Sequence, residues 1–435
     1  MLSAKDNEMM CRVGPETPMG KALRRYWTPA LQSSDLPEPG GDPRRVELLG
    51  QTFVAFRGED GVIGFLDEAC PHRGVSLALG RVEECSLRCI FHGWRFDANG
   101  VLLETPNVAE PGFRTRVKAP AYPVREAGGL VWVYLGPKEL EPPFPHYPWF
   151  DFHPDHRLNG YLVENSNFVQ VIEALVDSSH LNILHADGLA ATLQSDLQYA
   201  KANRPMLADM APRMEAEATD FGFHYAALRK VEDGYEARIT AFVAPYATVN
   251  PNANLWMAVV PINDDQSIYF HVFFESDRKI GIEPLRSEQL RFIGLDDEAL
   301  RDSGLHWDTL NSPDKPSPLN GFKQNRDAMR RGETFSGFHS FSQEDAAVIQ
   351  SAGALRDRRG ENLAPSDAAI VRLYRTLLSI AKSAETGEDP VGLAADTMQI
   401  FGLQGKVPEG GWQAMVPTHR RVSQSQPRAG TSASL

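Results

Sequence analysis

Four side chains that commonly bind metals lie close together in the first quarter of the chain. Cys70 and His72 are separated by one residue, sixteen residues follow, and Cys89 and His92 are separated by two. Two thiolates and two imidazoles form a familiar metal-ligand set. Tetrahedral zinc accepts the same set, so a zinc site is the first interpretation to weigh.

The distribution of these ligands favours an iron–sulfur cluster over zinc. Each segment contributes one Cys and one His, so two loops can hold two iron atoms, with both thiolates on one iron and both imidazoles on the other. Gly74 and Gly93 lie beside the ligands, and glycine lets the backbone approach a cluster closely. A Rieske [2Fe–2S] centre has this ligand set. The predicted cluster ligands are Cys70, His72, Cys89 and His92.

The chain has two further cysteines, Cys11 and Cys85. A secreted disulfide scaffold would be denser in cysteine. Neither residue has an evident partner in the sequence, so we expect both to be small, unpaired thiols.

A second candidate site is formed by Asp177, His180 and His185, in a stretch with helical spacing of apolar residues. Asp177 and His180 are three residues apart and share a helix face. His180 and His185 are five apart, about 140° around an ideal helix, so both reach one metal only if the helix kinks or ends between them. This spacing differs from the i,i+4 histidine pair of zinc proteases. Taken alone, it is also compatible with one core and one surface histidine.

The composition is typical of a folded protein with more than one domain. The chain of 435 residues has room for two or three domains, and 42% hydrophobic and 23% charged residues are ordinary values. The net charge of −13 argues against nucleic acid or an anionic membrane as the main partner. No apolar run approaches the roughly 18 residues of a membrane helix. The N-terminal sequence shows no signal peptide, so we expect a cytoplasmic protein.

The first part of the chain predicts a small all-β domain. Alternating residues over 43–66 indicate two strands joined by a turn, and Asn99-Gly100 indicates a hairpin within 95–104. Residues 128–136 indicate another strand. The proline-rich stretch 136–154 cannot lie in a central sheet, so the domain boundary falls there.

Beyond this boundary the pattern is α+β. Apolar residues at helical spacing predict a helix over 165–185, and further helices are expected over 343–357 and 365–383. Residues 218–275 return to strand-like alternation, which predicts a sheet with helices packed on it. The polar end, 423–435, is expected to be disordered.

These motifs together resemble a known family. CPHRG and CxxHGWRFD, with VGPETPMGKALRRYWTPA upstream, are similar to the large (alpha) subunits of Rieske non-haem iron oxygenases that act on aromatic rings, in the phthalate dioxygenase-like branch. The resemblance implies a small all-β Rieske domain joined to an α+β catalytic domain of helix-grip (START-like) type with an antiparallel sheet. The divisions we expect are an N-terminal segment packed on the catalytic domain (1–27), the Rieske domain (28–140), the catalytic domain (141–418) and a disordered tail (419–435).

The resemblance also implies a mononuclear iron site. NFVQVIEALVDSSHLNILH is similar to the iron-binding helix of the family, so His180 and His185 are the implied Fe(II) ligands. The third ligand of a 2-His-1-carboxylate triad must come from elsewhere. The segment 341–373 matches the family region that supplies it, and places it at Asp345 rather than Glu344, where the family commonly has glutamine.

Asp177 is implied to bridge two metal centres. By resemblance it hydrogen-bonds His180 on one side and a cluster histidine of a neighbouring subunit on the other, which implies a head-to-tail homotrimer or a stacked hexamer. A separate reductase, with flavin and a plant-type [2Fe–2S] centre, would bring electrons from NAD(P)H, since the chain has no GxGxxG nucleotide fingerprint. Ala174 replaces an asparagine that many relatives carry three residues before the bridging Asp; we do not interpret it as inactivation.

An aromatic carboxylate substrate needs a cation in an otherwise apolar pocket. Arg229 and Arg238 are the candidates, both on expected strands. Arg229 has apolar neighbours on its strand face, which favours it as the pocket residue. Arg238 shares its face with Glu236, so an ion pair on a solvated surface is the simpler interpretation there.

We therefore expect the oxygenase component of a two-component Rieske system. It would use O2 and NAD(P)H to hydroxylate an aromatic carboxylate such as a phthalate or a substituted benzoate, by cis-dihydroxylation. The alternative within the enzyme class is a Rieske monooxygenase that O-demethylates a methoxybenzoate-type substrate. The alternative of another class is a Rieske electron-transfer or ligand-binding protein without oxygenase activity.

Overall fold

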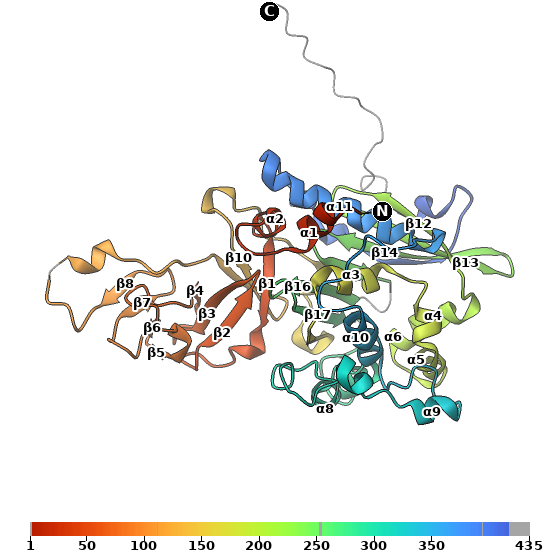
Figure 1. The fold of residues 1–435 in the computed structure, drawn as a ribbon, viewed down its shortest axis with the longest axis horizontal. Coiled ribbons are helices and arrows are strands. Elements are labelled where there is room, and N and C mark those ends of the chain that lie inside the picture. The colour runs from red at the N-terminus through yellow and green to blue at the C-terminus, as the bar shows by residue number, and fades with distance from the viewer. Residues whose placement is uncertain (1, 111, 252–254, 394, 417–435) are drawn as a thin grey trace, which may run out of the picture.

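The computed structural model of the chain describes residues 2–110, 112–251, 255–393 and 395–416. The tail predicted over 419–435 lies outside them. The molecule is elongated: the strands of residues 44–104 occupy one end of its long axis, and the helices of residues 181–203 lie toward the other end (Figure 1). Among the described residues, no helix combines the length and the apolar character needed to cross a bilayer.

Small antiparallel sheets make up the described N-terminal part of the chain. Their strand orders are β1 (Trp27–Gln32)–β10 (Leu130–Tyr134)–β9 (Val124–Ala127), β2 (Arg44–Leu48)–β3 (Gln51–Arg57)–β4 (Ile63–Asp67), and β5 (Arg81–Glu83)–β6 (Ser86–Arg88)–β7 (Arg95–Asp97)–β8 (Leu102–Glu104). The hairpin at Asn99-Gly100 joins β7 and β8, as predicted, and Gly100 supplies the positive φ of 78° that its turn requires. The strand expected within 128–136 is β10.

The prediction of two strands over 43–66 is wrong, because the structure has three there. A two-residue turn, Leu49-Gly50, joins β2 and β3, with φ values of 53° and 70°. Two positive φ angles suit a tight hairpin but usually involve Asn-Gly, so Leu49 conceals the turn in the sequence. The same turn docks on the C-terminal part: its amides donate to the carbonyls of Pro261 and Ile262, at 3.0 and 2.7 Å.

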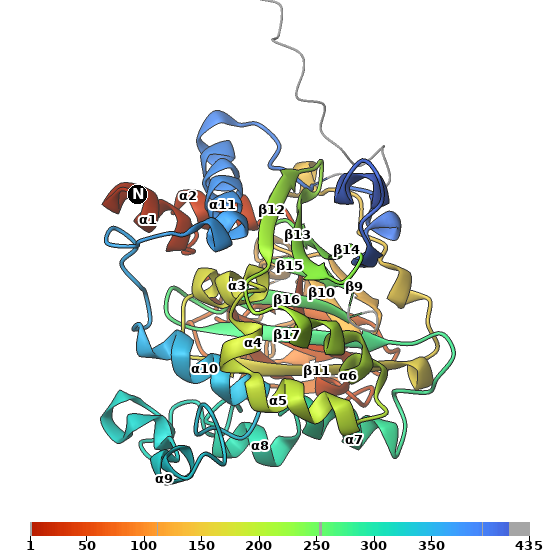
Figure 2. The same cartoon turned by 90° about the vertical axis from the view of Figure 1, so that its right-hand side faces the viewer.

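The C-terminal part is built on an antiparallel sheet, as predicted. Its strand order is β11 (Arg157–Glu164)–β17 (Ser267–Phe274)–β16 (Leu255–Pro261)–β15 (Ala247–Asn250)–β14 (Gly234–Val243)–β13 (Gly222–Val231)–β12 (Arg213–Ala218), and β18 (Leu403–Lys406) pairs with β14. Strands β12 and β13 contact α11 (Ala368–Thr386), and β16 contacts α3 (Phe168–Val176). The N-terminal helices α1 (Ala4–Cys11) and α2 (Pro18–Leu23) pack beside α11 (Figure 2).

The predicted helix over 165–185 is interrupted. α3 ends at Val176, α4 covers Leu181–Leu184 and α5 covers Ala186–Ala191. Asp177 has extended backbone angles, and its carboxylate accepts hydrogen bonds from the amide and hydroxyl of Ser179, at 2.7 and 2.6 Å. This local bonding competes with the helix and ends it. His180 therefore precedes α4, and His185 lies between α4 and α5.

Two later helices are shifted from their predicted ranges. The helix expected over 343–357 is α10, Phe341–Ser351, and it packs on α3. The helix expected over 365–383 is α11, preceded by a 3₁₀ turn over Pro365–Asp367.

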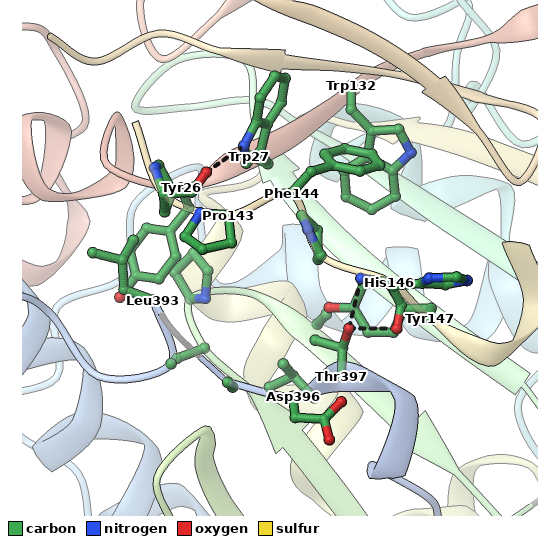
Figure 3. Close-up of a pocket in the computed structure, with 18 of the residues that line it drawn as sticks. Tyr26, Trp27, Trp132, Pro143, Phe144, His146, Tyr147, Leu393, Asp396 and Thr397 are labelled. Carbon is green, nitrogen blue, oxygen red and sulfur yellow. Dashed lines mark hydrogen bonds between the residues drawn. The ribbon is translucent and has the colours of Figure 1, made fainter. Parts of the chain in front are cut away.

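Aromatic side chains line a cavity at the junction of the two parts (Figure 3). The indole nitrogen of Trp27 donates to the carbonyl of Pro142, at 3.1 Å. The Thr397 hydroxyl accepts from the amide of His146 at 2.9 Å and donates to its carbonyl at 2.7 Å. These bonds hold the proline-rich linker between strand β1 and the C-terminal part, and none of the predicted site residues lines the cavity.

A fully buried arginine ties the N-terminal helix to α3. The Arg358 side chain is 0% exposed; its Nε donates to Glu173 at 2.5 Å, and an Nη donates to Asn7 and to the thiol of Cys11, at 3.0 and 3.3 Å. Arg356 pairs with the other oxygen of Glu173 at 2.6 Å. Cys11 is thus a buried core thiol, and burial raises its pKa to about 11.

Replacing Arg358 with alanine is expected to lower the free energy of unfolding by about 3–5 kcal/mol, because it leaves a buried carboxylate short of a partner. Urea denaturation followed by tryptophan fluorescence measures the change. The neighbouring Arg359→Ala is the matched control: its pair with Asp357 is exposed on both sides, and such pairs contribute about 0–1 kcal/mol. Equal effects of the two substitutions would contradict this role for Arg358.

Candidate cluster and metal sites

The two predicted cluster loops have the same backbone geometry. The amide of Cys70 donates to the carbonyl of Val75 at 2.9 Å, and the carbonyl of Cys70 accepts from the amide of Gly74 at 2.8 Å. Cys89 repeats both bonds with Trp94 and Gly93, at 2.9 and 3.0 Å. The two glycines have φ values of 72° and 73°, which glycine adopts without strain. Two equivalent loops thus face a shared space, one after β4 and one after β6.

The four predicted cluster ligands come together between these two loops, a region that we call the cluster tip. The rings of His72 and His92 are 4.4 Å apart between centroids, and His72 stacks on Trp94 at 4.3 Å. Cys70 and Cys89 are buried, while both histidines are half-buried. Burial raises the pKa of the Cys70 thiol to about 11, Cys89 adds to the rise, and the amides of His72 and Arg73 oppose it.

A single zinc ion fits this set poorly. In the described part of the chain, the only three metal-ligating side chains whose donor atoms lie within 4.8 Å of one another are His180, His185 and Asp345. The two cysteines and two histidines therefore do not converge on one point, as a tetrahedral site requires. Two buried thiols and two half-buried imidazoles would suit a two-iron cluster, with the thiolates holding one iron and the imidazoles holding the other. Cys85 lies apart from them and is exposed.

The second predicted set also converges. Asp345 Oδ1 lies 3.1 Å from His185 Nε2 and 3.6 Å from His180 Nε2. The break at His185 supplies the kink that the five-residue spacing demands, and α10 brings Asp345 from 160 residues downstream. Three ligands, two imidazoles and a carboxylate, are the donor set of a 2-His-1-carboxylate iron site.

The donor atoms of this set are arranged to bind a metal ion. His180 Nε2 and Asp345 Oδ1 are buried without a hydrogen-bond partner, a costly arrangement unless something else binds them. Burial raises the pKa of Asp345, but the two histidines outweigh it and lower the value overall. Burial lowers the pKa of His185, yet Asp345 and Glu344 raise it to about 10. Such a negative field attracts a cation, and a divalent metal would displace the proton.

Glu344, which precedes the predicted ligand Asp345, lies behind His185. Its Oε2 lies 2.7 Å from His185 Nδ1, and its Oε1 accepts from the Ser336 hydroxyl at 2.5 Å. The carboxylate is buried and points away from the other ligands. A hydrogen bond from Nδ1 leaves the Nε2 lone pair of His185 free for a metal and fixes the ring orientation.

Asp177 lies beside the set without joining it. Its Oδ2 is 3.5 Å from His180 Nδ1, while its Oδ1 accepts both bonds from Ser179. Burial raises the pKa of Asp177, but hydrogen bonds from His180 and Ser179 bring it below the usual value. The carboxylate stays charged and faces the far side of the His180 ring.

The triad separates two hollows. The inner cavity lies between the sheet and the helices, and its wall includes Leu162, Leu175, Tyr225, Arg238, Met257 and Tyr269. The outer hollow opens on the other side and is lined by Glu173, Arg356, Glu361 and Tyr374. Ala174, Asp177, His180 and Asp345 line both.

The two candidate arginines are both buried, which reverses their predicted ranking. Arg238 is 4% exposed and lines the inner cavity; Glu236 instead accepts from Gln404 of β18. Arg229 is 3% exposed but is absent from the described cavity wall. Both reach Ser178: Arg229 donates to its carbonyl at 3.4 Å and Arg238 to its hydroxyl at 3.3 Å. Strand alternation shows which residues share a face, but not whether helices cover that face.

Two polar residues of the inner cavity were not identified from the sequence. Glu164 on β11 and His271 on β17 are buried, and each has a side-chain atom without a hydrogen-bond partner. His271 stands alone among apolar residues in IYFHVFF, whereas Glu164 ends an apolar run in GYLVEN and is followed by polar residues. An isolated polar residue in a buried strand is a signal that would have found His271.

Comparison with known proteins agrees with this geometry. Residues 26–123 match the Rieske [2Fe-2S] domain family, and residues 133–427 match the family described as LigXa C-terminal domain like. The chain is 35% identical over 406 residues to the phthalate 4,5-dioxygenase oxygenase subunit of Pseudomonas putida, covering 90% of this chain and 89% of that one. It is also 35% identical over 404 residues to the 3-chlorobenzoate-3,4-dioxygenase oxygenase subunit of Comamonas testosteroni, covering 90% and 92%.

The fold has solved counterparts. A dicamba monooxygenase bound to dicamba superimposes with a TM-score of 0.54 at 18% identity, covering 84% of this chain and 99% of that one. The loops that converge at one end and the triad that converges at the other are thus found in a chain with this family's sequence and fold. The protein belongs to the Rieske non-haem iron oxygenases, as an oxygenase large subunit of the phthalate dioxygenase-like branch with a Rieske [2Fe–2S] cluster and a mononuclear iron.

Proposed function

We propose that Cys70, His72, Cys89 and His92 hold the cluster and that His180, His185 and Asp345 hold the mononuclear iron. The paired loops and the half-buried imidazoles support the first assignment. The unpartnered, buried donor atoms of the triad support the second. When bound, the cluster supplies single electrons and the iron activates O2.

The function that this site supports best is hydroxylation of an aromatic carboxylate, using O2 and electrons from NAD(P)H through a separate reductase. One observation carries it: a buried arginine, Arg238, lines a cavity that also has apolar wall residues and that ends at the triad. Arg238 would hold the carboxylate and the apolar wall would hold the ring, so that a ring edge faces the iron. The named substrates of two relatives, phthalate and 3-chlorobenzoate, are aromatic carboxylates.

Cis-dihydroxylation is our proposed outcome, and O-demethylation is the second candidate. A 5,5'-dehydrodivanillate O-demethylase oxygenase subunit from Sphingobium is 31% identical over 91% of this chain, which keeps that candidate in view. Turnover of substituted benzoates under labelled O2 with a generic reductase separates them. Two labelled oxygen atoms in one product support dihydroxylation, whereas one labelled atom with release of formaldehyde would establish demethylation.

Electron transfer is proposed to pass between chains. Within one chain the cluster loops and the triad lie far apart along the long axis (Figure 1). Exposed apolar residues, Ile90 and Phe91, flank His92 at the cluster tip, and such patches mark interfaces. The outer hollow, whose lining includes Asp177, would receive this tip from a second copy, so that Asp177 would join a cluster histidine to His180. Repeated head to tail, this contact closes into a ring, and a homotrimer is the expected form.

Mixed trimers test this route. A chain with His92→Ala lacks a working cluster, and a chain with His180→Ala lacks the mononuclear iron, so each alone should be inactive. Coexpressed in equal amounts, they should recover about a quarter of wild-type turnover, because one site in four pairs an intact iron with an intact neighbouring cluster. Recovery of no activity, with both chains folded and assembled, would argue for transfer within one chain.

Removing Glu344 is expected to weaken iron binding while sparing the cluster. Glu344→Ala should lower the affinity of the triad for iron by about 10–100-fold, because His185 loses the partner that orients it. Glu344→Gln keeps a hydrogen-bond acceptor and should lose much less. Iron retained after dialysis against a chelator gives the result, and the visible absorbance of the cluster is the internal control. Equal iron loss in both variants would show that the charge, rather than the hydrogen bond, is what matters.

A further inference from the structure

The inner cavity is lined by one face of the large sheet. Tyr269 and His271 of β17 line it, and so does Met257 of β16. Side chains alternate along a strand, so the intervening Trp256 and Phe270 point to the opposite face, where they belong to the hydrophobic core. Met257 thus lies on the cavity side of the sheet, and it is 6% exposed.

The sulfur of Met257 is held by a tyrosine. The Tyr269 hydroxyl donates a hydrogen bond to Met257 Sδ at 2.9 Å. In the register of the two strands Met257 lies opposite His271, so Tyr269, two residues earlier, is its diagonal neighbour on the same face. The bond engages one lone pair of the thioether, which is a weak acceptor, and leaves the other lone pair available to react.

The described part of the cavity wall has a second methionine, Met206. It lies in the 3₁₀ turn Arg204–Ala208 and is 1% exposed. Among the described residues, the bond from Tyr269 to Met257 is the one hydrogen bond to a methionine sulfur. The two methionines therefore share a cavity but differ in the donor beside the sulfur, which makes Met206 a reference for the reactivity of Met257.

A hydroxyl beside a thioether can assist its oxidation. When hydrogen peroxide oxidises a thioether to a sulfoxide, the sulfur gives an electron pair to one peroxide oxygen and the O–O bond breaks. The departing oxygen takes up a proton and leaves as water, and the S–OH group that remains loses its own proton. The sulfur is thus oxidised by two electrons and the peroxide is reduced by two. The Tyr269 hydroxyl, at hydrogen-bond distance from the sulfur, can donate the first proton and accept the second.

We propose that Met257 is a redox-modification site, at which hydrogen peroxide that enters the inner cavity converts the thioether to a sulfoxide with the Tyr269 hydroxyl as proton donor. Peroxide forms when O2 takes up two electrons and two protons without hydroxylating a ring, so the site responds to turnover without substrate. The sulfoxide makes an apolar part of the wall polar and lowers the affinity for an aromatic ring, until a methionine sulfoxide reductase restores it. The oxidation is independent of the proposed substrate, whereas its effect on ring binding rests on the proposed function.

The first experiment compares methionines within one protein. The full-length oxygenase, before and after its mononuclear iron is removed with a chelator, is treated with hydrogen peroxide, and peptide mass spectrometry follows sulfoxide formation at each methionine. Met257 should oxidise about tenfold or more faster than Met206 in both samples. Met214, which is equally exposed but absent from the described cavity wall, is the second reference. Equal rates at the three positions, or a preference for Met257 that vanishes with the iron, would overturn the proposal.

Removing the hydroxyl tests the proton donor. Tyr269→Phe keeps the ring and should slow the oxidation of Met257 to about the rate of Met206, with the other methionines unchanged. Tyr199→Phe is the matched control, because it removes a hydroxyl from the same wall without touching the sulfur, and it should leave the rate at Met257 unchanged. Cluster absorbance shows that both variants are folded. If Met257 oxidises as fast in Tyr269→Phe as in the wild type, Tyr269 does not assist the reaction.

Benzoate binding tests the consequence. After peroxide treatment the wild-type protein should bind benzoate about tenfold more weakly, in line with other small changes in an apolar pocket. Met257→Leu has no sulfur to oxidise at this position and should keep its affinity through the same treatment. Unchanged affinity of the wild type with Met257 fully oxidised would overturn the effect on binding. If benzoate does not bind even before treatment, the proposed function is wrong, while the comparison of methionines still decides whether Met257 is the modification site.

Discussion

The interruption of the helix between α3 and α4 is the constraint on which the metal site depends. Two histidines five residues apart cannot face one point on a continuous helix. The carboxylate of Asp177 accepts hydrogen bonds from Ser179 and ends α3. Two buried arginines of the sheet, Arg229 and Arg238, donate hydrogen bonds to Ser178. The loop that presents His180 is thus fixed by local hydrogen bonds on one side and by the sheet on the other. A continuous helix would be simpler to fold but would separate the histidines.

Charge around the triad is arranged in layers. Glu344 and Asp177 lie behind the two histidines, and Asp345 lies between them, so negative charge surrounds the point where a cation would sit. The guanidinium groups of Arg229 and Arg238 lie on the other side of Ser178. Burying like charges so close together is tolerable only with opposite charge or a metal nearby.

The sequence was sufficient for those features that short motifs or periodicity encode. The cluster loops, the antiparallel sheet and the carboxylate region near Asp345 follow from residue types and from the family resemblance. Features that depend on which faces of the sheet are covered by helices could not be predicted from the sequence. Alternation placed Arg229 among apolar neighbours and Arg238 beside an acid, but only the packed helices show that both are buried. The Leu49-Gly50 turn was not predicted for a different reason. The positive φ of Leu49 is imposed by its tertiary contacts rather than by the preference of leucine itself.

That turn has a consequence for how the enzyme moves. Its two amides hydrogen-bond to carbonyls at the end of β16, as one strand would to another, so the cluster-bearing part is fastened to the catalytic sheet by main-chain bonds as well as by a linker. Domains joined only by a linker swing relative to each other. Here the cluster-bearing part is held in one position against the catalytic sheet. In the proposed ring of subunits, the distance that an electron must cross would then be set by subunit assembly, and dissociation rather than hinge motion would interrupt electron transfer.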